Sequence, residues 1–295
     1  MKPPNLSLLC RFTAFLIASL FSSLCISAAQ PIQVWLDMAL PGTTLHLPPG
    51  EYSGPGVINK PLTIDGKGKV IIRNDGKGTV LTIRADKVTL RGLTLRGSGD
   101  SHDALDGGIM AEGNQLLIED KEMEKVLFSI SLHRTTDSVV RNNHIRSRGH
   151  DSADRGDGLR LWYSTRNRIE NNDIAKIRDI TVTNSTHNRF VGNKIQDSRL
   201  AFNLLFAHRT LIDGNVLNKN STGIIALNSD GLLIRNNRIM HAMDASGAGI
   251  ALKETSAALV IGNDIVHCAH GFMADSPMSP TNRITFYGNR VAHNI

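Results

Sequence analysis

The chain has 295 residues, of which 41% are hydrophobic and 20% are charged, so it is long enough to bury a large core. Only 5% of the residues are aromatic, and the net charge of +6 comes without a basic cluster interleaved with aromatic residues. This composition excludes a typical nucleic-acid-binding surface, whereas an acidic protein partner or polysaccharide remains compatible with it.

Residues 1–29 have the features of a secretory signal peptide: basic residues near the start, an apolar stretch at 12–26 and small residues at 27–29. The apolar stretch is short for a membrane span, and no later stretch is long enough. We therefore expect an exported protein with one mature domain, residues 30–295, that does not itself span a membrane. Cys268 is then the single remaining cysteine, which excludes an internal disulfide.

The mature chain begins with a pattern that predicts a short amphipathic helix over residues 31–40, with Ile32, Trp35 and Leu36 on its apolar side. Short strands are expected next, at 44–47, 62–66, 70–72, 80–83 and 88–95, separated by Gly, Asp, Lys and Pro. The end units of a repetitive fold need an atypical cover, so this helix is expected to be a cap.

An asparagine recurs through the second half of the chain and marks a repeat. It occupies positions 143, 172, 193, 215, 237, 263 and 289, so successive copies are 21 to 29 residues apart. Strands of three to five residues flank each copy, and periods of this length indicate a solenoid. Buried asparagines at equivalent turns are expected to stack and to donate their amides to neighbouring coils.

The pattern predicts an all-β fold, a right-handed parallel β-helix of about ten coils with a short N-terminal capping helix. At roughly 4.8 Å per coil this is a rod about 45–50 Å long. Leucine-rich repeats are the competing solenoid, but they need a helical segment in each repeat and a different leucine spacing, and neither is found.

Equivalent positions in successive coils should form columns on the surface. The position ten residues before each asparagine, or before Asp120 as its substitute in one coil, is unusually apolar for an outer face. It holds Met110, His133, Trp162, Thr183, Leu205, Leu227 and Lys253, and Arg160 lies in the column two residues earlier. We interpret Met110, His133, Arg160, Trp162, Leu205 and Leu227 as a partner-binding strip. The alternative is that a loop of this chain, residues 146–157, covers it.

A second column lies four residues after each asparagine and contains histidine in the last three coils. It reads Lys176, Asp197, Lys219, His241, His267 and His293. With Cys268 beside it, this column offers the nitrogen and sulfur ligands that copper or zinc prefer. We predict a candidate metal site from His241, His267, His293 and Cys268. The alternative is a turn column filled by polar residues without a ligand.

The densest acidic group is His150, Asp151, Asp154 and Asp157, within an insertion that lengthens one coil. A polysaccharide-modifying β-helix would place paired carboxylates and arginines on neighbouring strands of a groove. These acids instead share a loop with Arg155, which is expected to pair with one of them. Catalytic residues are therefore not predicted, although a polysaccharide-binding or polysaccharide-modifying β-helix remains the alternative function. A purely structural β-helix is a further one.

Three segments resemble the NosD family of periplasmic β-helix proteins, which take part in nitrous oxide reductase maturation. They are Asp106–Ile109, Val126–His133 and, most specifically, Asp154–Ser164, with the sequence DRGDGLRLWYS. The resemblance extends from about Gln30 to about Asn289. The segment Phe202–Phe206 departs from the family, because it lacks the histidine and methionine that the family tends to carry there.

The resemblance implies a binding and handover role, not catalysis. In the family the β-helix docks on the membrane subunit of an ABC transporter and helps to pass copper, received from a copper chaperone, to the client copper enzyme. It also implies a periplasmic location and copper as the metal.

Overall fold

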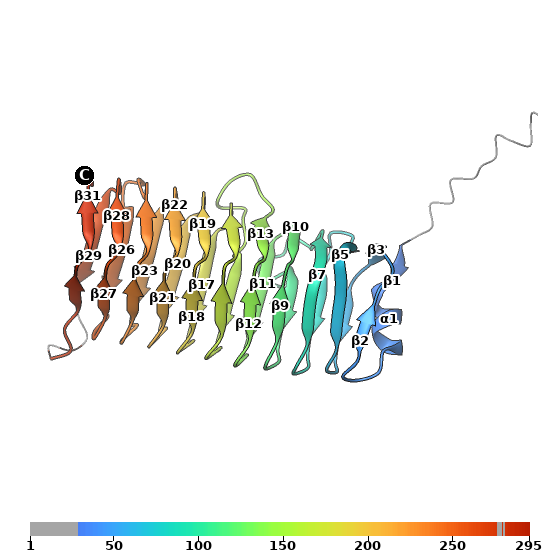
Figure 1. Ribbon diagram of the computed structural model, residues 1–295. Coiled ribbons are helices and arrows are strands. Elements are labelled where there is room, and N and C mark those ends of the chain that lie inside the picture. Colours follow the sequence, from blue (N-terminus) through green and yellow to red (C-terminus); the bar gives the residue numbers. More distant parts are fainter. Residues whose placement is uncertain (1–28, 276–278, 280) are drawn as a thin grey trace, which may run out of the picture.

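The computed structural model describes residues 29–275, 279 and 281–295, which wind into a parallel β-solenoid of about twelve turns (Figure 1). The predicted signal peptide lies outside these residues except for Ala29. Every strand pair is parallel, and each coil contributes strands to up to three ladders. The all-β parallel solenoid confirms the predicted fold class.

Ladder 1 comprises β2 (Thr44–His46), the start of β5 (Thr63–Arg73), the start of β7 (Thr89–Arg96), β9 (Leu117–Glu119), β12 (Val139–Arg141), β15 (Arg168–Glu170), β18 (Arg189–Val191), β21 (Leu211–Asp213), β24 (Leu233–Arg235), β27 (Leu259–Ile261) and β30 (Thr285–Tyr287). Ladder 2 comprises β1 (Gln30–Pro31), β3 (Gly50–Ser53), the ends of β5 and β7, β10 (Glu122–Val126), β13 (His144–Ser147), β16 (Asp173–Ala175), β19 (Lys194–Gln196), β22 (Val216–Asn218), β25 (Arg238–Met240), β28 (Asp264–Val266) and β31 (Arg290–Ala292). Ladder 3 comprises β4 (Gly56–Ile58), β6 (Leu81–Ile83), β8 (Gly107–Ala111), β11 (Phe128–His133), β14 (Leu159–Trp162), β17 (Asp179–Thr183), β20 (Leu200–Leu205), β23 (Thr222–Leu227), β26 (Ala248–Lys253) and β29 (His270–Asp275).

The number of turns exceeds the predicted ten by about two. The sequence count relied on the asparagine repeat, which begins at Asn143. The earliest coils, around β1 to β5, use glycine turns and carry no asparagine at the equivalent position, so the repeat does not register them.

The core is a stack of inward-facing aliphatic side chains. Strand alternation places one residue of each short strand inside, such as Ile118, Val140, Ile169 and Ile212, all 0% exposed. Burying each of these side chains contributes about 1.5–3 kcal/mol. At the N-terminal end, α1 (Ile32–Met38) buries Ile32 and Leu36 against β4, which confirms the predicted cap.

The recurrent asparagines form a continuous row between ladders 1 and 2, as predicted, and all but the last, Asn289, are buried. Each Nδ2 donates to Oδ1 of the asparagine one coil further on, at 2.8–3.0 Å, from Asn143 through to Asn289. The second amide hydrogen reaches a main-chain carbonyl of the preceding coil, for example Ile169 O at 2.9 Å from Asn193 Nδ2. The residue before each asparagine has a positive φ, such as 52° at Asn171 and 67° at Gly192, which explains the recurring Asn-Asn and Gly-Asn pairs.

The residue that continues this ladder toward the N-terminus is Lys121, not Asp120 as predicted. Asp120 occupies the left-handed position, with φ 55°, and the backbone N–H of Lys121 donates to Asn143 Oδ1 at 3.0 Å. Lys121 is 2% exposed, and its Nζ has no hydrogen-bond partner among the described residues. Burial lowers the pKa of this amine well below its usual value, with nearby Asp120 and Glu119 opposing the shift.

The predicted insertion is the loop between β13 and β14, which arches over the rod beside β13 in Figure 1. Arg155 was expected to pair with one of the loop acids, but the structure contradicts this. Its guanidinium donates to two main-chain carbonyls instead, His150 O at 2.7 Å and Asp197 O at 3.1 Å. The Arg155 side chain therefore connects the loop to the turn that contains Asp197.

Candidate functional site

The three C-terminal histidines lie directly above one another at the turn between ladders 2 and 3. The ring centroids of His241 and His267 are 5.5 Å apart with an interplanar angle of 7°, and those of His267 and His293 are 5.1 Å apart with an angle of 13°. All three residues have positive φ values, between 55° and 60°. The predicted column is thus present, and its rings are exposed.

The structure does not bring Cys268 to these rings. Its side chain is 0% exposed and faces the core, where Sγ lies 3.5 Å from Val266 O, and burial raises the pKa of the thiol. Across residues 29–275, 279 and 281–295, no three His, Cys, Asp or Glu side chains are placed to hold a metal ion. The rings stack face to face and do not converge on one point, so metal binding here stays a prediction.

His241 has one ring nitrogen engaged and one free. Its Nδ1 lies 2.9 Å from Asn218 Oδ1, and because that oxygen only accepts, Nδ1 carries the hydrogen. Nε2 then keeps its lone pair, which is the form of imidazole that coordinates metals.

The predicted partner-binding strip lies on the outer face of ladder 3, with one change of register. His133, Trp162, Thr183, Leu205, Leu227 and Lys253 form one column. Met110, however, pairs with Ser131 and so belongs to the neighbouring column with Arg160. Counting from Asp120 instead of Lys121 accounts for one residue of this displacement, and the segment between β8 and β9, one residue shorter than that between β11 and β12, accounts for the other.

The strip divides into two chemically different halves. Toward the C-terminus, Leu205, Leu227 and Ile225 are partly exposed and apolar. Toward the N-terminus, the guanidinium Cζ of Arg160 lies 5.3 Å from the ring centroid of Trp162, within reach of a cation–π interaction.

Two buried carboxylates beside this face were missed by the sequence reasoning, which found no acids and arginines on neighbouring strands. Asp157 and Asp179 are 1% and 2% exposed and lie in successive coils. Arg178 Nε donates to Asp157 Oδ1 at 3.1 Å, and Arg199 Nε donates to Asp179 Oδ1 at 2.9 Å. Burial raises the pKa of Asp157, an effect that Arg178 opposes.

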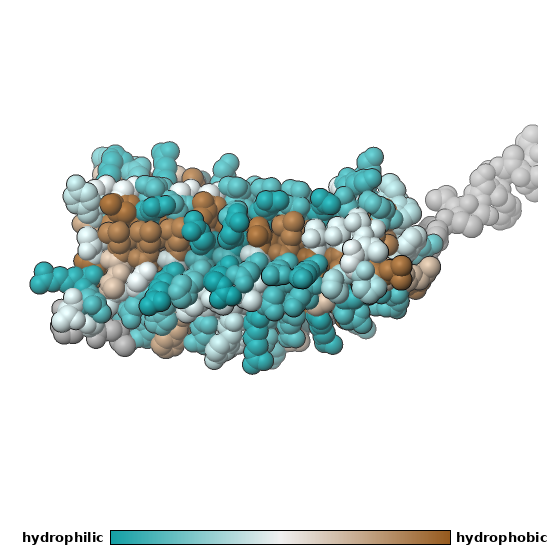
Figure 2. All heavy atoms as spheres, turned by 60° about the horizontal axis from the view of Figure 1, so that its bottom comes forward, coloured by the Kyte–Doolittle hydropathy of each residue, from teal (hydrophilic) through white to brown (hydrophobic). Residues whose placement is uncertain are grey.

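A second apolar surface, also missed, follows ladder 1. Figure 2 turns the lower edge of Figure 1 forward and shows a hydrophobic band along the rod, interrupted by hydrophilic residues. The outward column of ladder 1 consists of Leu117, Val139, Arg168, Arg189, Leu211, Leu233 and Leu259. Two apolar segments are thus separated by a pair of arginines.

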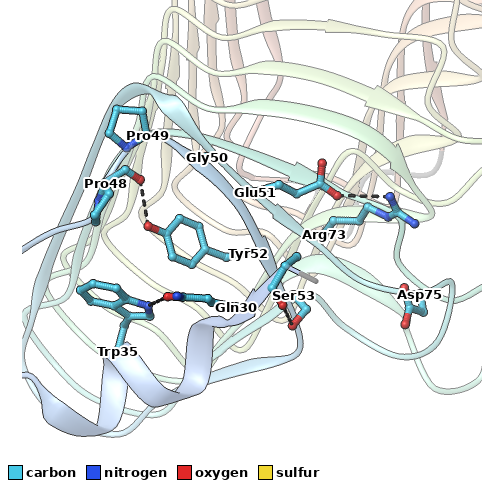
Figure 3. A pocket seen from close by; sticks show the side chains of 11 residues that line it. Gln30, Trp35, Pro48, Pro49, Gly50, Glu51, Tyr52, Ser53, Arg73 and Asp75 are labelled. Atoms are coloured by element: carbon cyan, nitrogen blue, oxygen red, sulfur yellow. Dashed lines mark hydrogen bonds and ion pairs between the residues drawn. The ribbon is translucent and has the colours of Figure 1, made fainter. Parts of the chain in front are cut away.

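A cleft of about 930 Å³ opens at the capped N-terminal end (Figure 3). The rings of Trp35 and Tyr52 meet edge to face at 6.1 Å, and Tyr52 Oη donates to Pro48 O at 2.8 Å. On the rim, Arg73 pairs with Glu51 at 3.2 Å. These groups are thus hydrogen-bonded or paired with one another within the cleft.

The family comparison matches residues 142–294, which include the insertion, most of ladder 3 and all three stacked histidines. The matching family is described as "Periplasmic copper-binding protein (NosD)". The chain belongs to the NosD family. No helix within the described part of this NosD-family chain is both long and apolar enough to cross a membrane.

Two curated relatives are similar to part of this NosD-family chain, and both are described as "Probable ABC transporter binding protein NosD". The protein of Stutzerimonas stutzeri is 30% identical over 137 residues, which cover 45% of this chain and 31% of the relative. That of Pseudomonas aeruginosa is 26% identical over 167 residues, which cover 56% of this chain and 39% of the relative. The match therefore spans less than half the length of either relative.

Solved structures with a similar fold include polysaccharide-active enzymes. The A-module of the Azotobacter vinelandii mannuronan C-5 epimerase AlgE6 has a TM-score of 0.59 at 17% identity, covering 90% of this chain and 93% of that one. The Yersinia enterocolitica family 28 exopolygalacturonase has a TM-score of 0.62 at 10% identity, covering 87% and 64%. At these identities the likeness concerns the fold alone.

Proposed function

We propose that this NosD-family protein is a periplasmic accessory protein that helps to deliver copper to a copper enzyme of the nitrous oxide reductase type. It would act as a binding scaffold, not as an enzyme, beside the membrane subunit of an ABC transporter and a copper chaperone. The observation that carries the proposal is the exposed stack of three imidazoles within the region that matches a copper-binding family.

Copper would be cargo at this site, held briefly and passed on. Imidazole nitrogen suits copper, and neighbouring coils supply one ring each at strand spacing. Because the rings are exposed, rotation about their side-chain bonds can turn two neighbouring Nε2 atoms toward one ion. Such an open pair of ligands favours exchange over permanent retention, whereas buried Cys268 is not needed for it.

Replacing His241, His267 and His293 together with alanine should abolish copper binding by the mature protein. The exposed rings make few contacts, so the free energy of unfolding of the variant should lie within about 1 kcal/mol of the parent value. Cu(I) titration with a competing chromophoric chelator measures the stoichiometry. The matched control is His187→Ala, on another turn. Equal stoichiometry in the parent and the triple variant would exclude this column as the copper site.

The partner-binding proposal concerns the apolar half of the ladder 3 strip. Leu205 and Leu227 are partly exposed on neighbouring strands, and such contiguous apolar surface is typical of protein contacts. A carboxylate placed there would be buried without a partner on docking.

The double variant Leu205→Asp/Leu227→Asp should reduce capture of the transporter membrane subunit or the client copper enzyme about tenfold or more. Capture from periplasmic and membrane fractions, with mass-spectrometric identification, measures this. The control is Leu233→Asp/Leu259→Asp on ladder 1. If only the control variant loses the partner, docking occurs on ladder 1 and the assignment to ladder 3 is wrong.

A further inference from the structure

Arg160 is a cation on the outer face of ladder 3 without an acidic partner. Its guanidinium has no hydrogen bond or ion pair within the described chain and is held over the ring of Trp162. By contrast, the nearby Arg178 and Arg199 are occupied by Asp157 and Asp179. The N–H groups of the Arg160 guanidinium are therefore free to bind a carboxylate of a ligand with two parallel hydrogen bonds.

The column that contains Arg160 is polar over four successive strands. Its members are Ser131, Arg160, Thr181 and Asn203. Ser131 is 4% exposed, and its buried hydroxyl has no hydrogen-bond partner among the described residues.

The other two polar members are oriented by the buried carboxylates. Asn203 Nδ2 donates to Asp179 Oδ2 at 3.4 Å, and the Thr181 hydroxyl lies close enough to Asp157 to oppose the rise in the pKa of that carboxyl. Neither the Asn203 amide oxygen nor the Thr181 hydroxyl oxygen accepts a hydrogen bond within the described residues, so both are left for an outside ligand. These acceptors recur at the strand spacing of about 4.8 Å.

An exposed aromatic ring borders the column. Tyr163 is 54% exposed, and its ring meets Trp162 edge to face at 5.5 Å. Aromatic rings of this kind pack against flat apolar faces and carry a hydroxyl for hydrogen bonding. The face therefore combines an exposed ring, a cation without an acidic partner among the described residues, and two outward polar side chains.

We propose that this surface binds a linear saccharide that bears carboxylate groups. Arg160 pairs with a sugar carboxylate, Tyr163 packs against a sugar ring, and Thr181 and Asn203 bond to hydroxyl groups of successive units. A row of acceptors at regular spacing needs a ligand with regularly spaced donors, which saccharide hydroxyls supply. This binding activity is separate from the proposed copper role, and it uses the polar half of the strip.

The test uses the fluorescence of Trp162. The chain has two tryptophans, so Trp35→Phe leaves Trp162 as the single reporter. Titration with hexagalacturonate should give a saturable change. In the same background, Arg160→Gln should weaken binding about tenfold or more, since a charged hydrogen-bonded pair is lost. Arg189→Gln, an equal charge change on ladder 1, should leave the affinity unchanged.

Three outcomes would overturn the proposal. The first is no saturable response to hexagalacturonate, and the second is equal affinity in Arg160→Gln, with circular dichroism showing that the variant is folded. The third is hexaglutamate binding as tightly as the saccharide, which would reassign the surface to an acidic protein segment. Carboxyl-reduced hexasaccharide should bind more weakly than the acid form. Copper stoichiometry is measured separately, so either proposal can fail alone.

Discussion

Replacing Asn193 with alanine should lower the free energy of unfolding by about 3–5 kcal/mol. The Asn193 carboxamide donates to Asn215 Oδ1 and to Ile169 O, and its own Oδ1 accepts from the side chain and backbone of Asn172. Alanine removes all four bonds and leaves buried polar groups without partners, each at a cost of about 1–3 kcal/mol. Urea denaturation followed by circular dichroism measures the change.

The control for this substitution is Asn282→Ala, at an exposed position outside the ladder. It should change the free energy of unfolding by less than about 0.5 kcal/mol. If Asn193→Ala is no more damaging than this control, the carboxamide ladder does not hold the coils together.

Replacing Lys121 with methionine should stabilise the protein, in contrast to Asn193→Ala. The free energy of unfolding at pH 7 should rise by an amount on the order of 1–4 kcal/mol. The buried amine of Lys121 has no partner in the described chain, and methionine fills similar space without a charge. The ammonium form is well solvated in the unfolded chain, so folding of the parent protein has to remove its proton or desolvate it.

The same residue gives a pH dependence whose sign follows from the lowered pKa. Between the folded-state pKa and the unfolded value of 10.5, the unfolded chain holds a proton that the folded chain has released. The parent protein should therefore become more stable as pH rises through this window, and less stable as pH falls.

In Lys121→Met this contribution to the increase of the free energy of unfolding with pH should disappear. Denaturation at several pH values between 7 and 10 measures it, with exposed Lys194→Met as the control. Parallel stability profiles for the parent and Lys121→Met would contradict the burial argument.

Much of the fold could be read from the sequence because coils of nearly constant length place equivalent residues on top of one another. Counting from Asn237, Asn263 and Asn289 was sufficient to predict that three histidines would stack. Counting failed where the asparagine is replaced. Asp120 was taken for the ladder residue, whereas the left-handed backbone assigns that place to Lys121. Met110 was misplaced by this error together with a β8–β9 segment that is one residue shorter than β11–β12.

The buried acid–arginine pairs were missed because Asp157 was assigned to the surface loop. A signal was nevertheless present: Arg178 follows Asp157 by 21 residues and Arg199 follows Asp179 by 20, about one coil in each case. A search for opposite charges one coil apart would have found both pairs. Their burial could not have been predicted, because it depends on how neighbouring loops pack over the sheet.

The apolar column of ladder 1 was also within reach of the same counting. Leu211, Leu233 and Leu259 each precede a ladder asparagine by four residues. Only the columns ten and twelve residues before each asparagine and the column four residues after it were considered, so this surface was overlooked. Which of the two apolar surfaces meets a protein partner depends on the partner's shape, which the chain itself does not encode.

The seven asparagines also determine how the rod would come apart. Each carboxamide polarises the next one through their hydrogen bond, so the hydrogen bonds along this row strengthen one another. Loss of one carboxamide in the middle would divide the row into two shorter ones. The coils on each side would then unfold at their own temperature. A single unfolding transition of the whole rod is therefore expected only while this row of carboxamides is unbroken.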